Sequence, residues 1–245
     1  MEDTTPQLSK KEQHELDRQA KVAGREQAAK GRVLKHIALW LGILLLCAGA
    51  IWGLMKLGAS SGGGIAGALA EPVSLTDWSK GAPGASVVLV EYSDFQCPAC
   101  GSFYPFVKDI ATKYKDQVLV VYRHFPLIQH KQARLAAQAA EAAGFQGKFW
   151  EMHDKLFENQ ASWSGNSNAE QMFIIYAREL GLNEAAFASA LKSSESVKKI
   201  DADLLSGERS QVNSTPTFFL NGKKLTNLSS FADLEYEVKQ ALDSK

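Results

Sequence analysis

The chain contains 245 residues, of which 45% are hydrophobic and 22% are charged, so it can form a packed core in one large domain or two small ones. Its 27 basic and 27 acidic residues give a formal net charge of zero at pH 7, which provides no reason to expect nucleic acid or an anionic substrate. Only three cysteines occur, so the fold is not a scaffold held together by disulfides.

We predict that residues 1–36 form a polar tail. They are rich in Lys, Gln, Glu and Ala and show little apolar face, so we expect a solvated segment that is partly helical or disordered. The charges that follow Glu26 in this tail are all basic, namely Lys30, Arg32 and Lys35.

Residues 37–57 predict a single transmembrane helix. The part from 37 to 55 has no charged side chain and approaches the roughly 20 residues that a spanning helix needs. The basic cluster before it predicts a cytoplasmic N-terminus and an extracytoplasmic remainder, in a single-pass protein of the cell membrane. Two alternatives stay open: a buried core helix, and a signal peptide cleaved at the A-x-A sequence of residues 68–70.

Residues 58–72 are rich in Gly, Ser and Ala and predict a flexible linker. We expect the linker to tether the domain of residues 73–245 near the membrane and to let it turn toward protein substrates. That domain starts with an irregular stretch, in which we expect a short edge strand near Val73.

A C-x-x-C motif joins the first clear strand of this domain, residues 87–92, to a helix that reaches about residue 114. This junction places the Cys97 sulfur at a helix N-terminus, where free backbone N–H groups and the helix dipole stabilise a thiolate. We therefore predict that Cys97 is the exposed nucleophile and Cys100 the resolving cysteine of thiol–disulfide exchange. Pro98 suits the first helical position, because no hydrogen-bond donor is needed there.

A zinc half-site is the alternative interpretation of the C-x-x-C motif. Structural zinc usually needs about four ligands, often as two such pairs. The only other cysteine, Cys47, lies in the apolar run. We therefore predict a redox pair, with no metal and no organic cofactor.

Residues 118–124 predict a second strand, parallel to the first through a right-handed crossover. At its end, Arg123 and His124 are expected to be structural rather than catalytic, and so is His153. No strand-like run follows until after residue 209. Helical patterns punctuated by glycines occupy that part of the chain instead. The expected helices are residues 132–143, 148–159, 169–180, 184–191 and 196–206.

The last part of the chain predicts a strand pair and a helix. Thr215-Pro216 precedes a strand at residues 217–220, consistent with the rule that proline does not sit inside a central ladder. Asn221-Gly222 predicts a two-residue hairpin to a short strand at 223–225. Residues 231–242 predict an amphipathic closing helix.

These motifs together resemble the DsbA-like branch of the thioredoxin superfamily, and most closely its membrane-anchored bacterial members. The resemblance rests on the stretch from Val87 to Cys100, on residues 123–127, on Phe149-Trp150 and on Thr215-Pro216. It covers roughly residues 73–245 and implies an α/β thioredoxin-like fold with a helical insertion at about 128–210. In such a fold the insertion forms a cap beside the active site.

The resemblance also implies roles for residues outside the cysteine pair. Glu91, six residues before Cys97, would be a buried acid that moves protons to and from Cys100, with a pKa raised by desolvation. The alternative is a strand-edge glutamate that faces solvent. Pro216 would lie in a cis-proline loop against the cysteines, where the backbone of Thr215 pairs with an extended substrate chain. The alternative is an ordinary turn proline.

The function that follows is extracytoplasmic disulfide exchange with the cysteines of secreted or surface proteins, by a monomer that a quinone-linked membrane partner would reoxidise. Pro98-Ala99 lacks the histidine that strongly oxidising DsbA proteins carry between their cysteines, so we predict a mild oxidant. A disulfide reductase or isomerase remains the main alternative. From a different class, a non-catalytic tethered chaperone or copper-binding module also remains open.

Overall fold

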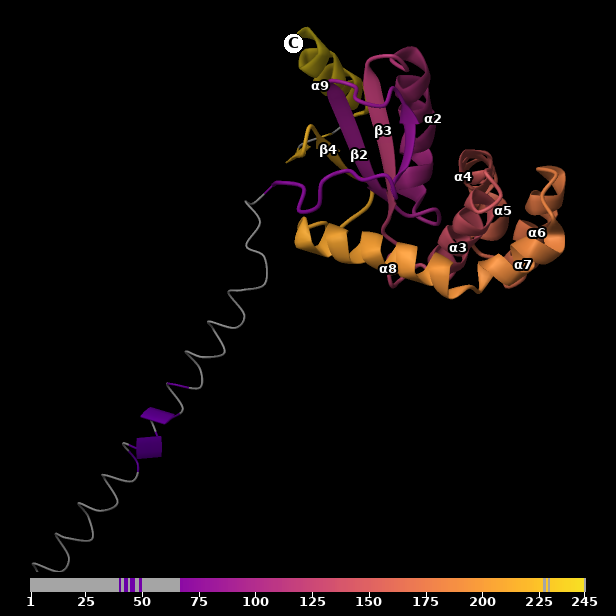
Figure 1. The fold of residues 1–245 in the computed structure, drawn as a ribbon, viewed down its shortest axis with the longest axis horizontal. Helices are drawn as coiled ribbons and strands as arrows, with labels where there is room; N and C mark the ends of the chain where they lie inside the picture. Colours follow the sequence, from indigo (N-terminus) through magenta and orange to yellow (C-terminus); the bar gives the residue numbers. More distant parts are fainter. Residues whose placement is uncertain are drawn as a thin grey trace, which may run out of the picture. The chain divides into compact units, whose positions relative to one another are not determined.

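A mixed sheet with the strand order β1-β3-β2-β4-β5 forms the centre of the domain (Figure 1). Its two central strands, β2 and β3, run parallel in register from Val87 opposite Val118 to Ser93 opposite His124, as predicted. The other neighbouring pairs are antiparallel. The strands are β1 Trp78–Gly81, β2 Val87–Ser93, β3 Val118–His124, β4 Thr217–Leu220 and β5 Lys223–Lys224.

The computed structural model describes residues 40, 42–43, 45–46, 49, 67–226, 228 and 230–244. The chain divides into two units, residues 1–63 and 64–245, and the fold described here belongs to the second. The predicted tail of residues 1–36, most of the predicted span of 37–57 and the linker up to residue 66 lie outside the described residues. Within the described part, no helix combines the length and the apolar character that crossing a membrane requires.

Two helices cover one face of the sheet. They are α2 Pro98–Lys113 and α9 Phe231–Asp243, whose apolar side chains share a core with alternate residues of β2 and β3 such as Leu89 and Val120. The other face, with Val90 and Val121, packs against Leu204 of the long helix α8 Ser194–Arg209. Because both faces are covered, a polar side chain on either face of the central strands is buried.

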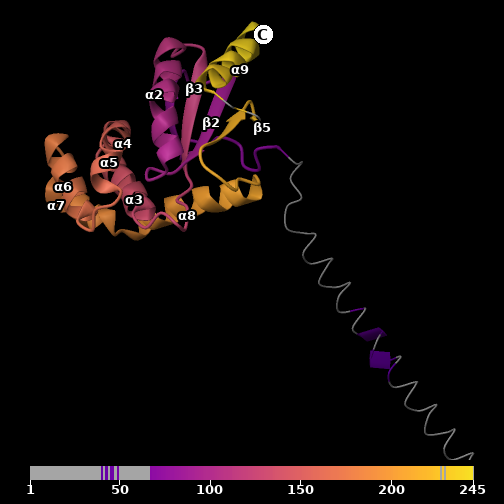
Figure 2. The same ribbon diagram turned by 180° about the vertical axis from the view of Figure 1, so that it is seen from behind.

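The insertion between β3 and β4 is helical, as predicted. Figure 2 shows α3 to α7 gathered on the side of the sheet that lies away from α9, with α8 leading back to the strands. The helix of four residues, α5, was not predicted, because it is too short to show a period. The insertion helices are α3 Ala133–Gly144, α4 Phe149–Glu158, α5 Gln160–Trp163, α6 Ala169–Glu179, α7 Glu184–Leu191 and α8 Ser194–Arg209.

The edge strand lies later in the chain than predicted. We expected it near Val73, but β1 begins at Trp78, whose ring stacks on Phe149 with 4.3 Å between the ring centroids. Gly81 ends the strand at φ 117°, where an added Cβ would lie 2.1 Å from the Val118 carbonyl oxygen. The strand position is therefore set by a long-range aromatic contact and a close backbone approach.

The packed domain also begins earlier than the expected boundary at Val73. Ala68 forms an antiparallel bridge with Lys223, and the Leu69 N–H donates to the Gly222 carbonyl oxygen at 2.8 Å. The Ala70 N–H donates to Ser210 Oγ at 2.9 Å. Residues 67–72 of the predicted linker are thus part of the domain surface.

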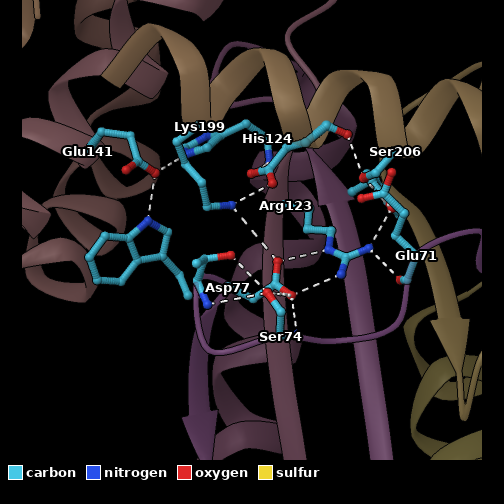
Figure 3. A network of polar contacts seen from close by, with 12 residues as sticks. Glu71, Ser74, Asp77, Arg123, His124, Glu141, Lys199 and Ser206 are labelled. Carbon is cyan, nitrogen blue, oxygen red and sulfur yellow. Dashed lines mark hydrogen bonds and ion pairs between the residues drawn. The ribbon is translucent and has the colours of Figure 1, made fainter. Parts of the chain in front are cut away.

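A buried polar network holds the segment of residues 71–77 against β3 (Figure 3). The Arg123 guanidinium donates to both carboxylate oxygens of Asp77 at 2.9 Å, and to the carbonyl oxygens of Glu71 and Pro72 at 3.0 Å. It also donates to the Tyr92 hydroxyl at 2.9 Å. These contacts agree with the structural role predicted for Arg123.

Replacing Arg123 with lysine is expected to lower the free energy of unfolding by about 2 kcal/mol, because an ammonium group cannot make the forked set of bonds. Urea denaturation checks this value. Lys113→Arg serves as a control, because Lys113 is half exposed on the surface of α2. Equal stabilities for Arg123→Lys and the wild-type protein would contradict the prediction.

Candidate active site

The two motif cysteines are free thiols at the start of α2. Cys97 is the N-cap residue and Pro98 follows at the first helical position, which confirms the predicted junction. The Cys97 side chain is only 7% exposed and Cys100 is fully buried. The prediction of an exposed nucleophile is therefore wrong, because Cys97 is buried as well, although slightly less than Cys100. Pro98 and Ala99 between them face solvent.

The surroundings move the pKa values of the two thiols in opposite directions. The pKa of Cys97 falls to about 5, chiefly through a hydrogen bond from the Cys100 side chain, and further through the Thr215 hydroxyl and the backbone N–H groups of Cys100 and Ala99. The pKa of Cys100 rises well above its usual value, because burial and then the neighbouring Cys97 and Glu91 disfavour its charged form. At neutral pH the pair therefore holds one thiolate, at Cys97, and one thiol, at Cys100.

The loop before β4 lies directly against the nucleophile. The peptide bond between Thr215 and Pro216 is cis, and the Thr215 carbonyl oxygen is 3.4 Å from Cys97 Sγ. The predicted cis-proline loop beside the cysteines is thus confirmed, and an ordinary turn proline is ruled out. Pairing of this loop with a substrate chain stays a prediction.

Glu91 lies inside the domain and is only 4% exposed. It is on the face of β2 that α2 covers, and its charge acts on the buried Cys100. Burial raises the pKa of the carboxyl to about 7, an effect that the Ser93 hydroxyl opposes. The alternative of a solvent-facing glutamate is therefore wrong, while the role of Glu91 in proton movement stays a prediction.

Asp94 organises the turn that leads into the motif. One carboxylate oxygen accepts from the Gln96 N–H at 2.7 Å. The other accepts from the Leu127 N–H at 2.9 Å and lies 2.6 Å from His130 Nδ1. Asp94 therefore fixes the turn that precedes Cys97.

The Gln160 side chain, from the unpredicted helix α5, forms hydrogen bonds with the active-site loop. Its amide nitrogen donates to the carbonyl oxygens of Phe95 at 2.7 Å and Cys97 at 2.9 Å. Gly101 permits this approach, because a Cβ there would lie 2.6 Å from Gln160 Oε1. A lone glutamine in a short helix carries no sequence signal, so sequence reasoning missed this contact.

Gln160→Ala is expected to lower the free energy of unfolding by about 2 kcal/mol, since the Phe95 carbonyl oxygen loses the amide donor and the Cys97 carbonyl oxygen is left with the Gly101 N–H. Gln146→Ala is the matched control. Its amide also makes two hydrogen bonds, both to the backbone of Asn183, away from the cysteines. We expect only Gln160→Ala to speed the alkylation of Cys97 by iodoacetamide, and equal alkylation rates in the two variants would refute the assignment.

The family model described as Thioredoxin matches residues 74–240. This match spans more than half of the sequence. The chain belongs to the thioredoxin family. The family domain therefore coincides with the packed unit that carries the cysteine pair and the cis-proline loop.

Solved structures of other proteins share this fold. Oxidised BdbD from Bacillus subtilis matches with a TM-score of 0.61 and 22% identity, over 72% of this chain and 98% of that one. A thioredoxin-like oxidoreductase from Silicibacter pomeroyi matches with a TM-score of 0.59 and 25% identity, over 70% and 95%. Alpha-DsbA1 from Wolbachia pipientis matches with a TM-score of 0.61 and 20% identity, over 70% and 94%. The thioredoxin-family domain thus has the DsbA-like fold of thiol–disulfide oxidoreductases.

Curated relatives share a segment of sequence with this thioredoxin-family chain. Na(+)/H(+) antiporter NhaA 1 of Salinispora arenicola is 40% identical over 60% of the chain, which is 22% of the antiporter. The protein of the same name in Mycobacterium sp. strain KMS is 38% identical over 63% of the chain and 26% of its own length. The chain spans about a quarter of the length of these relatives, so their transport activity is not carried over to it.

Proposed function

We propose that the protein is an extracytoplasmic thiol–disulfide oxidoreductase that oxidises cysteine pairs in secreted or surface proteins. The observation that carries the proposal is the cysteine pair at the N-terminus of α2, with Cys97 Sγ 3.4 Å from the Thr215 carbonyl oxygen of the cis-proline loop and Cys100 fully buried. These surroundings lower the pKa of Cys97 and raise that of Cys100. A substrate thiolate attacks Cys97 of the disulfide form, and Cys100 leaves. A second substrate thiolate then attacks the mixed disulfide, and Cys97 leaves as its stable thiolate. Two electrons pass from the substrate to the cysteine pair.

The proposed oxidant is a mild one. A thiol with a low pKa is a good leaving group, which favours release of the oxidised substrate. The pKa of Cys97, about 5, lies between about 3.5 for the strong oxidant DsbA and about 7 for the reductant thioredoxin. The exposed Pro98-Ala99 dipeptide supplies no side-chain donor that would lower this pKa further.

The reduction potential of the Cys97–Cys100 pair tests the proposed direction. The full chain in detergent is equilibrated with glutathione buffers, and the fraction of disulfide is read by thiol alkylation. A potential of about −120 to −180 mV supports the oxidant, or an isomerase. A value near about −250 mV or lower would make the protein a reductase.

The membrane arrangement belongs to the same proposal. A single span at residues 37–57 would hold the domain outside the cytoplasm, where it would act as a monomer and be reoxidised by a quinone-linked membrane partner. The basic residues before the apolar run support this orientation. A phosphatase reporter fused to the C-terminus should be active only outside the cytoplasm, and activity inside would overturn the orientation.

A further inference from the structure

Four polar side chains form a buried group on the face of the sheet that α2 covers. Glu91 lies opposite Tyr122 in the β2–β3 register, and Ser93 lies opposite His124. Side chains two residues apart on a strand point to the same face, so the four are neighbours. None is more than 4% exposed. Burial of unpaired polar groups is unfavourable. Four polar side chains together inside an aromatic core therefore indicate a role other than packing.

Two hydroxyl groups in this set lack hydrogen bonds. Among the described residues, neither Ser93 Oγ nor the Tyr122 hydroxyl has a well-aligned partner, although both are buried. The Ser93 hydroxyl nevertheless interacts with the side chains of Glu91 and Cys100, and it opposes the rise in the pKa of both. A hydroxyl has one donor and two acceptor sites and can rotate between neighbours. Ser93 is therefore placed between an acid and a thiol, with the Tyr122 hydroxyl as a third neighbour of its own hydroxyl.

We propose that the Ser93 hydroxyl relays the proton between the Glu91 carboxyl and the Cys100 sulfur. This inference rests on the proposed function. When a substrate thiolate attacks Cys97, the Cys97–Cys100 bond breaks and its electron pair passes to Cys100 Sγ. The Ser93 hydroxyl gives its proton to that sulfur and takes the proton of Glu91. A neutral Cys100 thiol and a Glu91 carboxylate result, and the steps reverse when Cys100 attacks.

A small cavity beside Glu91 provides the return path for the proton. Its volume is about 20 Å³, which is enough for one water molecule. Lys80, Lys108 and Asp154 line it and are partly exposed, so the cavity connects the buried carboxyl with the surface. The titratable groups that surround the relay are Lys80 of β1, Tyr122 and His124 of β3, Cys100, Tyr104 and Lys108 of α2, Glu141 of α3, and His153, Asp154 and Glu158 of α4.

Ser93→Ala tests the relay, and Ser206→Ala is its matched control. Ser206 is an equally buried serine, but it lies on α8 and bonds to the Tyr92 hydroxyl at 2.8 Å. Stopped-flow mixing of the oxidised full-length protein with dithiothreitol measures opening of the disulfide. We expect Ser93→Ala to slow it about tenfold at pH 7, less than the roughly 100-fold or more of a whole general acid because Glu91 is still present, and to weaken its dependence on pH between 6 and 8. Ser206→Ala is expected to keep the wild-type rate and pH profile.

Titration of the Cys97 thiolate at 240 nm gives the second measurement. Ser93 is not among the groups that act on Cys97, so the pKa of Cys97 should be unchanged in Ser93→Ala. If Ser93→Ala opens as fast as the wild-type protein with the same pH profile, the relay is wrong. If the wild-type pair exchanges with no thiol at all, the proposed function itself fails, whatever Ser93 does.

Should Ser93→Ala fail to fold, Ser93→Thr replaces it as the test, because threonine keeps the hydroxyl and suits a strand. The relay then requires that Ser93→Thr opens within about twofold of the wild-type rate. It also requires a normal solvent isotope effect in deuterium oxide, as proton transfer in the slow step gives. Absence of the isotope effect in both the wild-type protein and Ser93→Thr would overturn the relay.

Discussion

Replacing Cys100 with alanine is expected to turn the protein into a covalent trap for its substrates. Cys97 keeps its place at the N-terminus of α2, beside the Thr215 carbonyl oxygen, so it still forms mixed disulfides. The Cys100 thiolate, which would resolve a mixed disulfide by the reverse of the first exchange step, is gone. We expect turnover to be lost and complexes to accumulate, visible on non-reducing gels and removed by dithiothreitol.

Cys97→Ser is the matched variant, because it removes the nucleophile and leaves Cys100 fully buried. It should capture nothing and should lose cellular function. A chaperone or copper-binding module would predict the opposite, namely normal cellular function without Cys97. If Cys100→Ala captures no partner either, the assignment of the pair as a redox site is wrong.

Cys100→Ala also reports on how the two cysteines affect each other's pKa. The hydrogen bond from Cys100 is the largest contribution that lowers the pKa of Cys97. In Cys100→Ala that contribution disappears, so the pKa of Cys97 should rise from about 5 toward its ordinary value. Absorbance at 240 nm measures the change. An unchanged pKa would mean that the helix terminus and Thr215 stabilise the thiolate without the Cys100 side chain.

Local patterns in the sequence were sufficient for the parts of the site that lie in continuous segments. The C-x-x-C motif, the strand before it and the Asn221-Gly222 hairpin each depend on neighbouring residues. Asn221 and Gly222 take the positive φ angles, 49° and 81°, that such a two-residue turn requires. The place of Pro216 against the cysteines came from the family resemblance, and the structure confirms it.

The missed features all depend on where distant segments meet. Gln160 reaches the active-site loop only because the insertion folds back beside α2, and nothing in its own neighbourhood marks it. Trp78 defines the edge strand through Phe149, more than sixty positions away in the printed sequence. Whether Glu91 faced solvent depended on both faces of β2 being covered, which a single strand pattern does not reveal. Such contacts are decided by tertiary packing rather than by local periodicity.

Glu91→Gln is expected to stabilise the protein above pH 7. The pKa of Glu91 is about 7 in the folded domain, compared with 4.5 ordinarily, so the folded state binds more protons than the unfolded state between these values. The free energy of unfolding must therefore fall as the pH rises through this window, by about 3 kcal/mol in total. Glutamine carries no charge to desolvate, so the variant should lose this pH dependence and regain most of that stability at pH 8.

Urea denaturation of the reduced protein at pH 4.5 and pH 8 measures this difference. Glu208→Gln is the control, since the same chemical change is made at an exposed position near the end of α8. It should leave the pH dependence of the wild-type protein intact. Parallel stability curves for Glu91→Gln and the wild-type protein would show that the buried carboxyl does not titrate in this range.

The stabilised Glu91→Gln variant should be the poorer catalyst. Glutamine cannot supply a proton to the Cys100 thiolate, so opening of the disulfide should slow by about 100-fold, while the pKa of Cys97 stays the same. Greater stability together with lower activity at one residue is the pattern of a group kept for function rather than for folding. A variant that is more stable and opens at the wild-type rate would remove Glu91 from the mechanism, and it would leave the burial of this acid without a reason.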